Sequence, residues 1–193
     1  MDYETPRDEP RETTRTTDTA ILGGGCFWCL EAIFQRLPGV LRAEPGYAGG
    51  THPDPTYQEV CRGDTGHAEV VRITFDPQVI SYTGLLETFW KAHDPTTLNR
   101  QGEDRGPQYR SIILYTSQDQ RHQAEASLKR WNTANSSRGP GVTQIVALEQ
   151  FFPAEDYHHD YYRKNPRASY CRLVIQPKVE ALAPRDTRPC RNQ

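Results

Sequence analysis

The sequence lacks a dominant charge, a membrane-length apolar run and a recognisable secretory leader. Its 193 residues carry 23 basic and 25 acidic side chains, and the formal net charge of −2 gives no basic field that would attract nucleic acid. No apolar run approaches the roughly 20 residues that a helix needs to span a bilayer. The first 18 residues are polar and acidic, without the basic start and apolar middle of a signal peptide. We therefore expect a cytoplasmic protein that binds neither nucleic acid nor membrane.

Cysteines are few, and their number is odd. Five cysteines leave at least one thiol unpaired within the chain. Together with the missing leader, this favours a reducing compartment and catalytic or buried thiols over a structural disulfide framework. The chain length suits one domain. We expect a disordered tail at 1–15 and a single domain at 16–193, whose C-terminal segment is irregular from about 167.

Apolar residues alternate or recur at helical spacing along most of the chain. Strands that alternate with helices around one core predict a two-layer α/β sandwich. Long loops rich in turn residues are expected at 46–55 and 94–108. The expected strands are 19–22, 40–47, 68–75, 110–115 and 144–152, and the expected helices are 81–93, 117–131, 154–164 and one that starts at or just after Cys26 and stops at Pro38.

A glycine turn joins the first strand to the first helix in the stretch Gly23–Cys29. The first turn of a helix has unpaired N–H groups and a partial positive charge, which favour the thiolate form of Cys26. Phe27 and Trp28 provide apolar walls beside this thiol. The alternative is a small, buried and inert cysteine. The glycines favour the reactive interpretation, because they let a ligand approach the backbone closely.

Cys29 lies one helical turn after Cys26, and a C-x-x-C pair can serve redox chemistry, bind metal or be accidental. On one turn the two Cα atoms would be about 5 to 6 Å apart, a separation that a disulfide can span. Zinc is disfavoured, because there is no second C-x-x-C and the pair His158-His159 is thin support for further ligands. A nucleotide-binding G-x-G-x-x-G pattern is absent as well.

Other polar residues have two interpretations each. Glu69, at the start of a strand, could point into a cavity, where desolvation would raise its pKa and make it a proton donor. From the residues alone, a solvent-facing position is favoured. His67 is expected in a turn or at the surface, Asp104 in a solvated loop, and residues 158–160 on a solvated helix face.

Three tyrosines lie in or beside the predicted loops, at Tyr47, Tyr57 and Tyr109. Their hydroxyl groups could hold a polar oxygen of a substrate while the rings stay apolar. Each of them alone is more typical of packing.

Several long motifs in the same order resemble those of the A-type peptide methionine sulfoxide reductases. The similarity runs from about Thr19 to Pro166. The motifs are GCFW at 25–28, GYAGG at 46–50, PTYQEVCRGDTGHAE at 55–69, HDPTTLNRQG at 93–102 and QYRS at 108–111.

The resemblance implies a sandwich built around a mixed sheet, with 16–193 as the catalytic reductase domain. It implies reduction of the S epimer of methionine sulfoxide, free or in proteins; each epimer has its own enzyme. Cys26 corresponds to the nucleophile, Glu69 to the acid, and Phe27 and Trp28 to the pocket for the methyl group. The remaining site residues that the resemblance implies are Tyr57 and Tyr109 around the sulfoxide oxygen and Asp104 as a supporting carboxylate.

The resemblance also implies a sulfenic acid on Cys26, which a second thiol converts to a disulfide. Thioredoxin, or dithiothreitol in vitro, would reduce this disulfide, without a bound metal, flavin or nicotinamide. We rank Cys171 first as the second thiol and Cys29 second, with Cys190 as a possible relay outward. Cys61 is expected to be buried and inert. We expect a monomer.

Two other function classes remain open on the sequence. One is a general thiol–disulfide oxidoreductase that uses Cys26 and Cys29, although such proteins usually have Gly-Pro between the two cysteines. The other is a non-enzymatic module that binds oxidised methionine in the pocket of Phe27 and Trp28.

Overall fold

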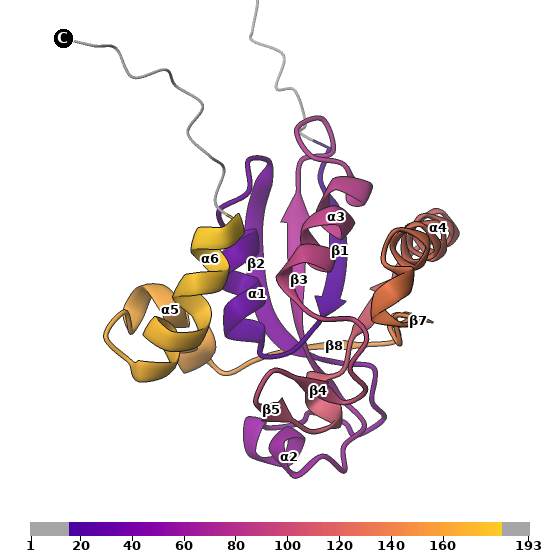
Figure 1. Cartoon of the computed structure of the whole chain (residues 1–193). Coiled ribbons are helices and arrows are strands. Elements are labelled where there is room, and N and C mark those ends of the chain that lie inside the picture. Colours follow the sequence, from indigo (N-terminus) through magenta and orange to yellow (C-terminus); the bar gives the residue numbers. More distant parts are fainter. Residues whose placement is uncertain (1–15, 183–193) are drawn as a thin grey trace, which may run out of the picture.

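The computed structural model describes residues 16–182, and its centre is a six-stranded mixed sheet (Figure 1). The strand order is β7-β6-β1-β3-β2-β8, and only the β6–β7 pair is parallel. The mixed α/β sandwich is therefore confirmed. The strands of this sheet are β1 (Asp18–Gly23), β2 (Val40–Ala48), β3 (Ala68–Phe75), β6 (Ile112–Tyr115), β7 (Gln144–Ala147) and β8 (Phe151–Pro153).

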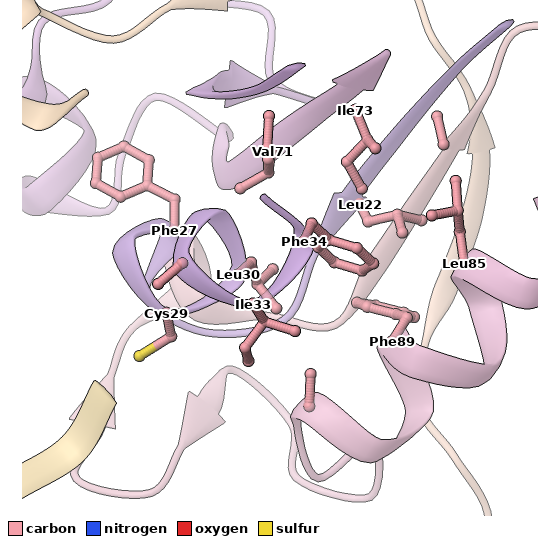
Figure 2. Packing of buried hydrophobic residues seen from close by; sticks show 14 of the residues in the cluster. Leu22, Phe27, Cys29, Leu30, Ile33, Phe34, Val71, Ile73, Leu85 and Phe89 are labelled. Atoms are coloured by element: carbon pink, nitrogen blue, oxygen red, sulfur yellow. The ribbon is translucent and has the colours of Figure 1, made fainter. Parts of the chain in front are cut away.

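Successive residues of β1 point to opposite faces of the sheet, as the two-residue period requires. Leu22 belongs to the large core that α1 (Phe27–Phe34) and α3 (Tyr82–Ala92) cover, and Ile21 belongs to a smaller cluster on the other face. Figure 2 shows side chains of α1 and α3 packed against Leu22 and strand β3. α4 (Gln118–Ala134) packs against α3 and the β6–β7 edge.

Two of the longer helices start with a serine cap. Ser81 accepts a hydrogen bond from the N–H of Gly84 at the start of α3, and Ser117 caps α4 in the same way.

One helix lies in a stretch for which no helix is predicted from the sequence. α2 (Tyr57–Arg62) begins with a capping box between Thr56 and Glu59 and ends at Gly63, whose φ is 79°. A short hairpin, β4 (Arg100–Gln101) with β5 (Asp104–Arg105), lies in the second predicted loop. Figure 1 shows α2 and this hairpin together beyond the end of β1.

The stretch 144–164 differs from its prediction. The expected strand 144–152 is two strands, β7 and β8, on opposite edges of the sheet. The expected helix 154–164 is a 3-10 turn at Asp156–His158 and a short α5 (Tyr161–Lys164). Asp160, with a φ of 57°, separates the two, because a left-handed residue interrupts a helix.

The C-terminal segment is helical rather than irregular, so that prediction was wrong for the residues described. The π-helix η4 (Cys171–Ile175) continues into α6 (Gln176–Leu182). Cys171, Ile175 and Val179 recur every four residues and are buried, which places one apolar stripe toward the core. Through this stripe, the segment packs against α1. None of the helices within residues 16–182 combines the length and apolarity that crossing a membrane requires.

Candidate active site

Cys26 lies at the junction between β1 and α1, where the sequence places it. It precedes the first residue of α1, and only 7% of it is exposed. Gly25 has a φ of 91°, and a Cβ atom there would lie 2.6 Å from Cγ of Gln101. A larger residue at this position would therefore be strained and would also displace the loop that carries Gln101.

The carboxyl group of Glu69 faces the start of α1. Glu69 is 1% exposed, and its Oε2 accepts a hydrogen bond of 3.0 Å from the backbone N–H of Phe27. Burial is the main reason that the pKa of Glu69 rises to about 8. The charges of Asp104 and Cys29 act in the same direction, and the hydrogen bond acts against them. The solvent-facing alternative is excluded, and the carboxyl group is protonated at neutral pH.

Two tyrosines interact with the same carboxyl group. Tyr57 from α2 and Tyr109, just before β6, both interact electrostatically with Glu69, and Tyr109 also interacts with Cys26. Burial is the main reason that the pKa of each tyrosine lies above its ordinary value. Both hydroxyl groups therefore keep their protons and can donate hydrogen bonds.

An aromatic cluster lies at the start of α1, directly after Cys26. Trp28 is half-buried and stacks on Tyr161, with ring centroids 3.6 Å apart and planes 6° apart. Its Nε1 donates a 3.1 Å hydrogen bond to Nδ1 of His158. Phe27 is fully buried, and its ring contacts Tyr57 and His158. The half-buried Trp28 thus offers an apolar surface at the site, and the buried ring of Phe27 packs beside it.

The two thiols of the C-x-x-C pair interact, and their pKa values move in opposite directions. Burial, first, and a hydrogen bond to Cys29 raise the pKa of Cys26 well above its ordinary value. The same hydrogen bond is the main cause that lowers the pKa of Cys29. The helix N-terminus was expected to make Cys26 a thiolate. Burial outweighs it in the substrate-free protein, because desolvation disfavours the charged form.

Tyr170 connects the predicted residue Asp104 to the thiols. Its hydroxyl donates a 2.7 Å hydrogen bond to Oδ2 of Asp104 and lies 4.0 Å from Sγ of Cys29. Cys171 is fully buried in η4 and interacts electrostatically with Cys29. Cys190 lies outside the described residues.

Three predictions about exposure were wrong. His158 is 0% exposed and lies among rings instead of on a solvated face. His67 is buried as well. Its Nδ1 accepts a hydrogen bond from the N–H of Gly50, and its Nε2 lies 2.8 Å from the carbonyl oxygen of His52. Cys61 is exposed on α2 instead of buried.

Sequence reasoning also missed residues that support the site. Glu155 accepts hydrogen bonds of 2.8 Å from the hydroxyl of Tyr47 and from the backbone N–H of Tyr57, and so ties α2 to β2. Nζ of Lys178 lies 4.0 Å from Sγ of Cys29. The only sequence signal for these supporting residues was the group of aromatic side chains at Tyr157–Tyr162. Within residues 16–182, no cluster of three or more His, Cys, Asp or Glu side chains could hold a metal ion.

A mixed α/β sandwich with two adjacent thiols and a buried, protonated carboxyl group defines a thiol-dependent redox protein. The comparisons narrow this class. The model of the family described as peptide methionine sulfoxide reductase matches residues 18–189, so the chain belongs to that family.

Curated relatives and solved structures point to the same family. Peptide methionine sulfoxide reductase MsrA of Sulfolobus acidocaldarius is 56% identical over 163 residues, which cover 84% of this chain and 92% of the relative. Methionine sulfoxide reductase A of Corynebacterium diphtheriae has a TM-score of 0.76 and 36% identity, over 82% of this chain and 79% of its own. Reduced Mxr1 of Saccharomyces cerevisiae has a TM-score of 0.75 and 32% identity, over 80% of this chain and 89% of its own. Mxr1 in complex with Trx2, at 20% identity, a TM-score of 0.54 and coverage of 82% and 91%, shares the fold.

Proposed function

We propose that this protein reduces the S epimer of methionine sulfoxide, free or in proteins, with its own thiols. The observation that carries the proposal is the protonated carboxyl group of Glu69, which is buried beside the thiol of Cys26. A sulfoxide sulfur is electrophilic, but its oxygen leaves only when it is protonated. An acid that holds its proton at neutral pH next to a nucleophile meets this need.

In the first step, Glu69 donates its proton to the sulfoxide oxygen, and the hydroxyl groups of Tyr57 and Tyr109 donate hydrogen bonds to it. The sulfur of Cys26 attacks the substrate sulfur, with the methyl group against Trp28, while the buried ring of Phe27 packs next to Trp28. The oxygen passes to Cys26, which becomes a sulfenic acid, and methionine is released. The thiol proton of Cys26 replaces the proton that the carboxyl group gave up.

In the second step, a thiol condenses with the sulfenic acid and water leaves. We place Cys29 ahead of Cys171 for this step, because Cys29 lies beside Cys26 and interacts with it. Cys171 interacts with Cys29, which suits it to receive the disulfide next. Cys190 would then pass the disulfide outward.

The reductant in this proposal is thioredoxin, or dithiothreitol in vitro, and no cofactor is bound. The solved complex of yeast Mxr1 with Trx2 supports the partner, as a property of that relative. We also propose a monomeric, cytoplasmic protein that binds neither nucleic acid nor membrane, on the sequence grounds above.

Turnover of the separate S and R epimers of methionine sulfoxide with dithiothreitol tests this function. We expect methionine from the S epimer alone. Turnover of the R epimer at an equal rate would refute the epimer assignment. Binding of oxidised methionine without any turnover would instead support a binding module.

Release of methionine by a Cys29→Ser variant tests the remaining alternative. A Cys29→Ser variant that still releases one methionine per protein argues against a general thiol–disulfide oxidoreductase. Loss of even this first methionine in Cys29→Ser would favour that class.

A further inference from the structure

The C-terminal helical segment brings one cation and one hydroxyl group to the second thiol of the C-x-x-C pair. Nζ of Lys178 on α6 and the hydroxyl of Tyr170 each lie 4.0 Å from Sγ of Cys29. The same hydroxyl donates a 2.7 Å hydrogen bond to Asp104. Figure 1 shows α6 alongside α1, the helix that carries Cys29. The four groups therefore meet where three separate parts of the chain come together.

We propose that Lys178 holds Cys29 as a thiolate for disulfide formation, and that Tyr170 passes the thiol proton of Cys29 to Asp104. Lys178 is thus a positioning residue for the second step of the reaction, and it takes no part in the release of methionine. This inference rests on the proposed function, because a sulfenic acid on Cys26 must first be formed.

The step balances. The thiol of Cys29 donates its proton to the oxygen of Tyr170, whose own proton moves along its hydrogen bond to the carboxylate of Asp104. The Cys29 thiolate attacks the sulfur of the Cys26 sulfenic acid, an S–S bond forms and the S–O bond breaks. The departing hydroxide takes the proton of Glu69 and leaves as water. Cys29 is oxidised, and the sulfenic sulfur is reduced to the disulfide level.

The charges around Cys29 explain why a cation is needed. Burial and the negative charge of Asp104 oppose the thiolate, and Cys29 also interacts with the carboxyl group of Glu69 and with Cys171. The pKa of Cys29 is nevertheless below its ordinary value, first through the hydrogen bond with Cys26, then through Lys178 and Tyr170. Lys178 offsets the acidic groups on this side of the site.

The test is the rate at which the sulfenic acid disappears after one turnover without reductant. In Lys178→Met, loss of the partly solvated charge at about 4 Å raises the pKa of Cys29, and below that pKa it cuts the thiolate about tenfold. A more basic thiolate is about threefold more nucleophilic. We therefore expect disulfide formation to be about threefold slower at pH 6. At a pH above the pKa of Cys29 in both proteins, disulfide formation in the variant should be as fast as in the unaltered protein or faster.

This crossover separates an electrostatic role from a structural one. Lys178→Arg should restore the original pH profile, and Lys129→Met, on the exposed surface of α4, should leave it unchanged. The first methionine should be released at the same rate in all four proteins. Tyr170→Phe, which keeps the ring beside Trp28, should slow the second step.

The outcomes that overturn the proposal are distinct. Equal pH profiles for Lys178→Met and the unaltered protein, or a uniform slowing at every pH, refute the role of Lys178. A normal second step in Tyr170→Phe refutes the proton path. Absence of the first methionine from the unaltered protein refutes the proposed function itself.

Discussion

Glu69→Gln should stabilise the fold at neutral pH while it impairs the reaction. Glutamine has nearly the shape of the protonated acid, and its side-chain oxygen can still accept the N–H of Phe27. It cannot lose a proton, however. The variant therefore removes the titration of one buried carboxyl group and leaves the packing of β3 against α1 almost as it was.

The magnitude follows from the pKa of Glu69, which rises from 4.5 to about 8 on folding. Below pH 4.5 the carboxyl group is protonated in the folded and the unfolded chain, and its titration has no effect on stability. Between pH 4.5 and about 8, the unfolded chain releases the proton of Glu69 and the folded chain keeps it. The folded state therefore loses stability as pH rises through this range. At about 1.4 kcal/mol per unit, the cost is about 3 kcal/mol at pH 7 and about 5 kcal/mol above pH 8.

Urea unfolding of both proteins at pH 5, 7 and 8.5 measures this difference. The free energy of unfolding of Glu69→Gln should exceed that of the unaltered protein by an amount that grows with pH. Any constant cost of burying the amide leaves that slope unchanged. Glu87→Gln, at an exposed position of α3, is the matched control and should show no such slope.

Single-turnover methionine formation completes the experiment. Loss of a proton donor should slow the first step about 10²- to 10⁴-fold. The deficit should be largest below pH 8, where Glu69 holds its proton, and should shrink above pH 8, where Glu69 loses it. A difference in stability that is the same at every pH, or an unchanged rate, would refute the reasoning.

Other substitutions test the rest of the site. Cys26→Ser should release no methionine even in a single turnover with dithiothreitol; any stoichiometric release, measured by chromatography, contradicts its role as the nucleophile. Cys29→Ser should release one methionine and then stall as the sulfenic acid, whereas Cys171→Ser should still form the first disulfide; peptide mapping by mass spectrometry decides, and a Cys26 disulfide to Cys171 in the unaltered protein would reverse our order. Gly50→Ala should lower the free energy of unfolding by about 1 to 3 kcal/mol, because its Cβ would lie 2.3 to 2.5 Å from backbone atoms of 65–67; an unchanged urea midpoint would show that this loop yields.

The strands and longer helices of the core could be predicted because their periodicity is local. The alternation in β3 and the helical spacing in α3 directly report which side chains are buried. The capping box of α2 was also present in the sequence, as Thr56 followed three residues later by Glu59, and it was overlooked.

Tertiary contacts explain the predictions that failed. His158 is buried because rings from α1 and α2 close around it, and nothing within residues 156–160 reveals those partners. The four-residue spacing of Cys171, Ile175 and Val179 was visible, but a proline at 177 and several arginines obscured it. The positions of Cys26 and Glu69 followed from the resemblance, whereas the relation of Lys178 to Cys29 depends on how the C-terminal segment folds back onto α1.

The opposed pKa shifts of the two thiols suit a reaction with two different steps. A buried, neutral Cys26 beside a protonated Glu69 carries no net charge, so a neutral sulfoxide can enter without the cost of desolvating an ion. The second step needs a thiolate that attacks the oxidised sulfur, and the more acidic Cys29 supplies it near a cation. If Cys26 were instead the more acidic thiol, it would be exposed to oxidants in the absence of substrate, and Cys29 would be a poor resolving group. The division of acidity between the two cysteines therefore follows the order in which they react.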